Sequence, residues 1–183
     1  MLKITKYHIL QFLSKKYTYI RYFNKFLFGL KLNGAMVGSR CYFLGCRRIY
    51  FGKCVELGNQ VRIQASEMVK IGSYSYIGHN NYIYGSVYIG EYFMSGPNVC
   101  IMGGNHGMAR DVNNTPMIIQ STFNSGGVTI GEDVWIGCNS VVLDGVKIAS
   151  HCVIGAGSVV TKNTVEWGVY AGNPAKLIKF RDY

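Results

Sequence analysis

A six-residue repeat is the feature of this sequence that most limits its fold. An aliphatic or aromatic residue recurs every six positions in two blocks, with a two-residue insertion inside the first block. These residues are Phe51, Leu57, Ile63, Ile71, Ile77, Ile83, Ile89 and, twelve further on, Ile101, followed in the second block by Ile130, Ile136, Val142, Ile148, Ile154 and Val160. An amphipathic helix repeats apolar residues at three and four positions and a strand at two, so neither explains a period of six.

The residues beside each repeated apolar position favour tight corners. Glycine often follows directly, as at Gly72 and Gly131, and a small or β-branched residue stands four positions on, as at Ser75 and Val134. Glycine permits a sharp change of direction, and small branched side chains suit a crowded interior. Short strands joined by such corners wind into a coil whose turns stack on one another. The sequence therefore predicts an all-β fold, a parallel β-helix of hexapeptide repeats.

The same repeat predicts which residues lie above one another. Three hexads make one turn, so residues 18 apart should stack: Tyr74 under Tyr92, and Tyr76 under Met94, all on the outside of the wall. Aromatic faces of this kind either stack on a sugar ring or fill a contact between subunits, and packing is the favoured interpretation.

We divide the chain into an N-terminal arm at 1–32, which its charge sets apart, a hexapeptide β-helix at 33–165 and a C-terminal tail at 166–183. The formal net charge is +10, and the arm has no acidic residue. Its seven bases are Lys3, Lys6, Lys15, Lys16, Arg21, Lys25 and Lys31. We expect a helical arm that either packs on the domain or lies in a membrane interface, because its apolar runs are too short to span a bilayer.

The cysteines and the absence of a leader-like segment indicate the compartment. None of the six cysteines forms a C-x-x-C pair, which argues against zinc-ribbon and thioredoxin-like chemistry. We therefore expect reduced thiols in a cytoplasmic protein, at the inner face of the membrane if the arm binds lipid. We expect no metal requirement and no nucleic-acid partner.

One segment interrupts the hexads. Residues 103–127 read GGNHGMARDVNNTPMIIQSTFNSGG, rich in Gly and Asn and poor in core residues. A long loop that leaves a rigid coil is usually functional or disordered. Its histidine and aspartate favour a functional loop.

The second block of hexads resembles a known family. The stretch VTIGEDVWIGCNSVVLDGVKIASHCVIGAGSVVTKN, followed by VYAGNPAKLIK, is similar to the hexapeptide-repeat acyltransferases, in particular the maltose, galactoside and capsular-sugar O-acetyltransferases. The resemblance covers roughly residues 51–179. It implies a left-handed coil, a homotrimer, and acetyl-CoA bound in a groove between neighbouring subunits.

The resemblance also implies a catalytic base. The GGNH element places His106 at the position of the family's loop histidine. A sugar hydroxyl is a poor nucleophile until it loses its proton, and an imidazole accepts and returns a proton near neutral pH. The resemblance therefore implies direct transfer to the acceptor, with no covalent enzyme intermediate. His8, His79 and His151 are interpreted as ordinary surface or hydrogen-bonded residues.

Further site residues follow from the same motifs. The resemblance implies cofactor contacts for Trp135, Cys138, Ala156, Thr161, Lys162 and Lys176, the lysines lying near the nucleotide phosphates. The family's acceptor-binding asparagine is replaced by Gly78 in our register. Candidate acceptor-binding residues are therefore Asn80, Asn81, Asn105 and Asp111.

Several functions remain open on the sequence alone. The favoured one is acetyl transfer from acetyl-CoA to a hydroxyl of a sugar or surface-polysaccharide precursor. Transfer to an amino sugar or to an antibiotic is the first alternative. A zinc enzyme of the γ-carbonic-anhydrase type would need three histidine ligands, and the H-x-x-x-x-H pair of that family is absent. A non-catalytic trimeric scaffold would explain the repeats but neither the loop histidine nor the AGNPAK tail.

Overall fold

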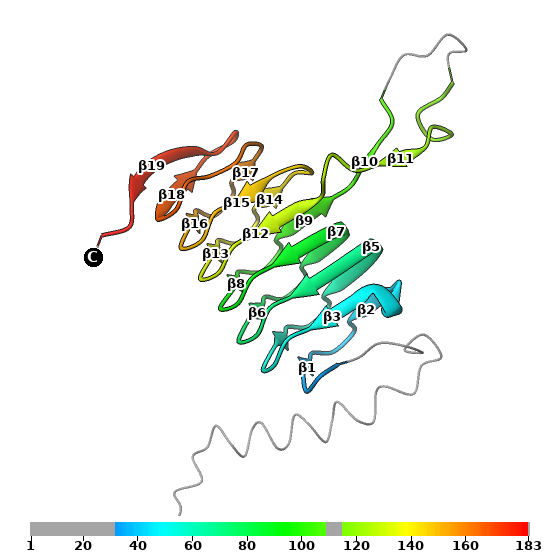
Figure 1. Ribbon diagram of the computed structural model, residues 1–183, viewed down its shortest axis with the longest axis horizontal. Helices are drawn as coiled ribbons and strands as arrows, with labels where there is room; N and C mark the ends of the chain where they lie inside the picture. Colours follow the sequence, from blue (N-terminus) through cyan, green and yellow to red (C-terminus); the bar gives the residue numbers. More distant parts are fainter. Residues whose placement is uncertain (1–31, 109–114, 183) are drawn as a thin grey trace, which may run out of the picture.

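The computed structural model describes residues 32–108 and 115–182, which form a parallel β-solenoid of about six turns (Figure 1). Most turns place residues in each of three ladders of short strands, which we call the first, second and third ladders. The corners that follow these ladders along the chain are called the first, second and third corners. A parallel strand needs a crossover connection, and here the other two sides of each turn supply it.

The first ladder is a sheet of eight strands in the order β1-β4-β6-β8-β13-β16-β18-β19. Its strands are β1 (Met36–Val37), β4 (Glu56–Leu57), β6 (Tyr76–Ile77), β8 (Met94–Ser95), β13 (Trp135–Ile136), β16 (Val153–Ile154), β18 (Gly168–Ala171) and β19 (Lys176–Phe180). All pairs are parallel except β18 with β19, so β19 folds back across the C-terminal end of the coil.

The second and third ladders belong to one bent sheet, because β5 (Arg62–Ile71) and β7 (Tyr82–Ile89) run through both. The second ladder also contains β2 (Tyr42–Leu44), β9 (Cys100–Gly103), β14 (Val141–Val142) and β17 (Val159–Val160). The third also contains β3 (Ile49–Phe51), β12 (Val128–Ile130) and β15 (Lys147–Ile148). The 3₁₀ helix η1 (Cys46–Arg48) occupies the second corner of the first turn.

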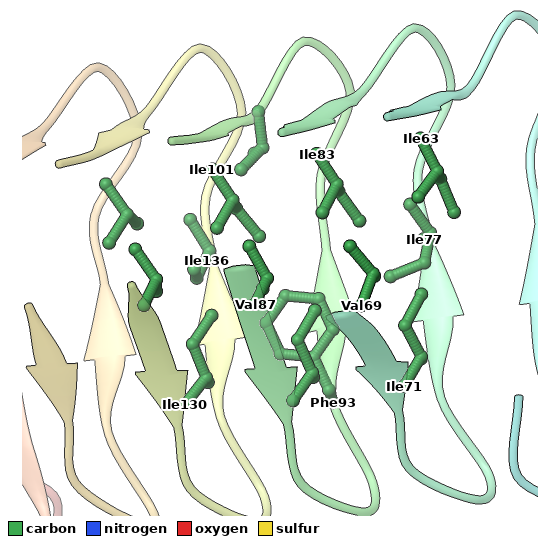
Figure 2. Packing of buried hydrophobic residues seen from close by; sticks show 14 of the residues in the cluster. Ile63, Val69, Ile71, Ile77, Ile83, Val87, Phe93, Ile101, Ile130 and Ile136 are labelled. Carbon is green, nitrogen blue, oxygen red and sulfur yellow. The ribbon is translucent and has the colours of Figure 1, made fainter. Parts of the chain in front are cut away.

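The repeated apolar residues fill the interior of the coil. Ile63, Ile83 and Ile101 stack in register on the second ladder, and each is at most 1% exposed. Figure 2 shows such side chains meeting between the ladders. Burying one isoleucine side chain stabilises the fold by roughly 1.5–3 kcal/mol, so this column is a main source of stability. The predicted hexapeptide β-helix is confirmed.

The predicted stacking of residues 18 apart is also confirmed. The rings of Tyr74 and Tyr92 stack with centroids 5.4 Å apart and an interplanar angle of 9°. Tyr76 pairs with Met94 in the first ladder. Tyr74, Tyr92 and Met94 are each about half exposed, so they face outward as expected.

Two of the predictions concern the two ends of the chain, the N-terminal arm and the C-terminal tail. The helical arm expected at 1–32 lies almost entirely outside the described residues. At the other end the solenoid continues past residue 165, because β18 pairs in parallel with β16. The first part of the segment expected as a tail is therefore a further rung. Among residues 32–108 and 115–182 no helix has the length and apolar character needed to cross a membrane.

Candidate functional site

His106 stands on a two-stranded stem that projects from the coil (Figure 1). The stem consists of β10 (Asn105–His106) and β11 (Thr122–Phe123), which pair antiparallel so that His106 lies opposite Thr122. The imidazole is exposed, and the His106 amide N–H donates to Oδ1 of Asn105 at 2.8 Å. The structure thus presents the histidine to solvent from an ordered ladder.

The stem continues beyond its ladder for one more pair of residues. The Gly107 amide donates to the Ser121 carbonyl at 3.1 Å. A turn then runs from Pro116 to Gln120, where the Ile119 amide donates to the Pro116 carbonyl at 2.9 Å. Several apolar side chains around this turn are largely exposed, namely Met108, Met117, Ile118 and Ile119. The part of the loop nearest His106 is therefore closed by hydrogen bonds between its two legs.

Three of the predicted cofactor residues lie on neighbouring turns, Trp135 in the first ladder and Cys138 and Ala156 at the first corner. Trp135 projects from β13 and is 48% exposed. The Gly157 amide donates to the Cys138 carbonyl at 2.8 Å, which stacks the corner containing Ala156 on the corner containing Cys138. Gly137 makes this stacking feasible, because a Cβ there would lie 2.5 Å from the Ala156 nitrogen. Cys138 and Ala156 are thereby stacked at one edge of the coil, and Trp135 lies in the strand that leads to the Cys138 corner.

The other three predicted cofactor residues are exposed near the C-terminal end. Thr161 and Lys162 follow β17, at the second corner, and Lys176 begins β19. The Ala175 amide donates to the Val159 carbonyl at 2.8 Å, so Lys176 begins beside the second ladder. The lysines are therefore free to approach an anion, and Thr161 and Lys162 lie on the same corner column as the stem of the loop.

Two of the four candidate acceptor-binding residues have structural partners in the coil. Asn81 is 2% exposed; its Nδ2 donates to the Ser95 hydroxyl at 2.6 Å and its Oδ1 accepts from the Val99 amide at 2.5 Å. Asn80 adopts a positive φ of 55°, and its Nδ2 donates to Oδ1 of Asn98 at 2.7 Å. These contacts join successive first corners, so they favour a structural role for both residues.

The remaining two candidates lie in the loop. Asn105 is exposed on the stem, where its side-chain oxygen already accepts the His106 amide. Asp111 lies outside the described residues. The structure thus brings Asn105 next to His106 and separates Asn80 and Asn81 from it by the width of the second ladder.

A polar cluster at the third corner involves residues that the family motifs do not assign. Nδ1 of His151 lies 3.0 Å from Oδ2 of Asp133, and the His151 ring stacks on Trp167 with centroids 4.1 Å apart. Arg181 donates to the same Asp133 oxygen at 2.9 Å. The hydrogen bond from His151, together with Arg181, lowers the pKa of the Asp133 carboxyl. The cluster joins the C-terminal segment to the coil. It also gives the His151 ring its hydrogen-bond and stacking partners at the third corner, far from the loop.

His79, His106 and His151 do not together form a metal site. Within the described part of the chain no group of three or more His, Cys, Asp or Glu side chains could hold a metal ion. His79 accepts the Asn59 amide at 2.8 Å at the first corner, His151 lies at the third, and His106 is on the loop.

Comparison with known proteins identifies the family. A family model described as bacterial transferase hexapeptide (six repeats) matches residues 127–162. WbbJ of Escherichia coli K12, named for O-acetyl transfer in lipopolysaccharide biosynthesis, is 34% identical over 159 residues, covering 80% of this chain and 79% of that protein. The chain belongs to the hexapeptide-repeat transferase family.

Other family members match shorter stretches or the fold alone. A protein of Lysinibacillus sphaericus named as a macrolide acetyltransferase is 45% identical to this transferase, over a stretch that spans only 37% of each protein. Among solved structures, a variant of the N-acyltransferase AntD from Bacillus cereus, in complex with dTDP-4-amino-4,6-dideoxyglucose and coenzyme A, has a TM-score of 0.74. It is 21% identical and covers 85% of this transferase and 87% of that chain, which establishes a shared fold.

Proposed function

We propose that this transferase moves an acetyl group from acetyl-CoA to a hydroxyl of a sugar or surface-polysaccharide precursor. The observation that supports this most is the exposed imidazole of His106, held on a paired stem that projects from a hexapeptide coil. Neither a purely structural coil nor a trimerisation scaffold requires such a group. Membership of a family whose matched relatives are named as acetyltransferases supports the same chemistry.

His106 acts as general base in this proposal. Its unprotonated ring nitrogen accepts the proton of the acceptor hydroxyl while the hydroxyl oxygen bonds to the thioester carbonyl carbon. When the carbon–sulfur bond breaks, the protonated imidazole returns the proton to the departing thiolate. The products are the acetyl ester and free CoA, so the step needs no other reactant. A positioned base of this type contributes roughly 10²–10⁴-fold to the rate.

Positive charge and an exposed aromatic ring support the cofactor assignment. Lys162 and Lys176 are exposed and make no ion pair within the described part of the chain, so each can pair with a phosphate. Trp135, Cys138 and Ala156 lie on neighbouring turns, and Thr161 adjoins Lys162. The proposal assigns CoA to these six residues and assigns no metal to the reaction.

The placement of these residues supports a homotrimer. Within one chain, His106 leaves the coil at the second corner, whereas Cys138 and Ala156 lie at the first, across the second ladder. A site that uses both sets is completed when the stem of one subunit approaches the first corner of its neighbour. Outward-facing Tyr76, Met94, Trp135, Val153 and Val169 form an in-register, largely apolar row for such a contact.

An amino sugar is the second candidate acceptor. The fold likeness to AntD, an N-acyltransferase crystallised with an amino-sugar nucleotide, favours it. The hydroxyl acceptor ranks first because the O-acetyltransferase WbbJ has the higher identity and comparable coverage. The two products differ chemically, since mild alkali cleaves an acetyl ester and leaves an acetamide intact.

The test begins with binding, which requires no knowledge of the acceptor. Calorimetric titration with CoA and acetyl-CoA should show about one site per chain in wild type and in His106→Ala, and weaker binding in Lys162→Ala. Transfer of labelled acetyl to a panel of sugars should then fall at least about 100-fold in His106→Ala. Absence of CoA binding in wild type would reject the proposal, and an alkali-stable product would move it to the amine acceptor.

A further inference from the structure

The second corner contains different numbers of residues in successive turns, and the turns that differ lie next to the catalytic loop. In the pairing of β5 with β7, Ala65 lies opposite Gly85 and Val69 opposite Val87. Residues 66–68 of one turn therefore face only Ser86 of the next, which is the two-residue insertion of the sequence repeat. The insertion produces an exposed bulge centred on Glu67, below a rung that turns tightly through Gly85 at φ +90°.

Both legs of the loop pack against this tight rung. A Cβ on either Gly103 or Gly127 would collide with the Ser86 carbonyl oxygen, so the two ends of the loop approach the same backbone atom. The returning leg then reaches the bulge, where Nδ2 of Asn124 donates to Oε1 of Glu67 at 2.5 Å. This bond joins residues 57 positions apart and ties the stem to the turn below the tight rung.

The turn of the coil on the other side of the loop bonds to Ser125, the residue after Asn124. Oδ2 of Asp144 accepts the amide of Ser125 at 2.6 Å, and the Gly145 amide donates to the Gly127 carbonyl at 2.8 Å. The second carboxylate oxygen of Asp144 is buried with no hydrogen-bond partner within the described part of the chain. Burying a carboxylate oxygen without a hydrogen-bond partner costs free energy, so Asp144 does little to stabilise its own corner. Its bond to the Ser125 amide in the loop is the better explanation for its presence there.

We infer that Glu67 and Asp144 are positioning residues for His106. They bond to the consecutive residues Asn124 and Ser125, immediately after β11, from the turns on either side of the loop. We call these two hydrogen bonds the grip. Because β11 pairs with β10, fixing Asn124 and Ser125 fixes the position of the His106 backbone above the coil, from which the imidazole projects. Neither carboxylate touches a reacting atom. The inference rests on the proposed function for its catalytic consequence, whereas the grip itself is a property of the fold.

The experiment isolates the bond between Glu67 and Asn124 by a double-mutant cycle. The variants are Glu67→Ala, Asn124→Ala, both together, and Glu67→Gln, which keeps an oxygen that can accept from Asn124. Glu91→Ala is the matched control, because Glu91 is an exposed acid at the third corner. For each protein we would measure amide hydrogen exchange of residues 103–108 and 120–127, CoA affinity, and the rate of acetyl transfer to the best sugar of the panel.

The expected result is faster exchange of the stem in both single alanine variants and a transfer kcat lower by roughly 10-fold, as misplacement of a catalytic group predicts. CoA affinity should stay within about twofold, and the double variant should be no worse than the worse single one. Glu67→Gln and Glu91→Ala should match wild type. Asp144→Ala should reproduce the loss of kcat independently.

Two results would overturn the inference. Unchanged exchange in Glu67→Ala and Asn124→Ala would show that the grip does not hold the stem. Faster exchange with an unchanged kcat would show that the stem does not position His106. If wild type neither binds CoA nor transfers acetyl, the proposed function fails instead, and the exchange data alone decide whether the grip exists.

Discussion

The coil and its extruded loop are stabilised in different ways. In the coil each contact is repeated one turn later, as in the column Ile63, Ile83 and Ile101 or the bonded corner residues Asn80, Asn98 and Asn139. In the loop each contact occurs once, as in the bonds of Asn124 and Ser125. Repetition makes the coil tolerant of a single change at its surface. The position of the loop depends on a few particular side chains.

The largest difference between coil and loop is expected in the stability lost when an isoleucine of each is replaced by alanine. Ile83→Ala removes a fully buried side chain and should cost about 3 kcal/mol, lowering Tm by roughly 10 °C. Ile118→Ala removes a side chain that is 82% exposed and should change stability by less than about 0.5 kcal/mol. Thermal unfolding of both variants beside wild type gives the comparison. Equal losses would show that the turn at Pro116–Gln120 is packed as firmly as the coil.

The same distinction explains what the sequence could predict. The inward position of Ile83 and the stacking of Tyr74 on Tyr92 follow from the period alone, because hexads give one face per side and 18 residues give one turn. The structural role of Asn81 could have been predicted too. It stands four positions after Ile77, where Ser75 and Ser140 also occur in their own hexads, and all three are buried.

Contacts without a period could not be predicted in this way. The bond between Glu67 and Asn124 joins a two-residue insertion to a loop, and neither segment has a position in the repeat. The pair of Asp133 and His151 has the separation of one turn, so the period places them together. Arg181, which completes that cluster, comes from β19 and its flank, outside the hexads. The sequence therefore predicted the scaffold and the loop that carries His106, but not the contacts that orient the loop.

A smaller effect is expected where a single contact fastens the end of the coil. The bonds from His151 and Arg181 lower the pKa of Asp133, so its charged form is stabilised in the folded state. A depressed folded pKa adds stability above the unfolded value of about 3.9, and this contribution is lost as pH falls through the folded pKa. Because the Asp133 side chain is 47% exposed, solvent screening limits the contribution to about 1 kcal/mol or less.

Urea unfolding of wild type and Asp133→Asn between pH 3 and pH 7 measures this contribution. Wild type should be the more stable protein at pH 6 and 7, and the two curves should approach each other as pH falls below about 3.9 toward the lowered pKa of Asp133. Asp182→Asn is the matched control, because Asp182 also has a lowered pKa, caused by Lys179, but lies on the surface with its side chain 84% exposed. A gap between wild type and Asp133→Asn that stays constant with pH would assign the role of Asp133 to side-chain packing. If the difference in unfolding free energy from wild type disappears at low pH for Asp133→Asn but not for Asp182→Asn, the ionised cluster around Asp133 stabilises the C-terminal end of the coil. That end would then depend on a single ionic contact, whereas the rest of the coil depends on contacts repeated in every turn.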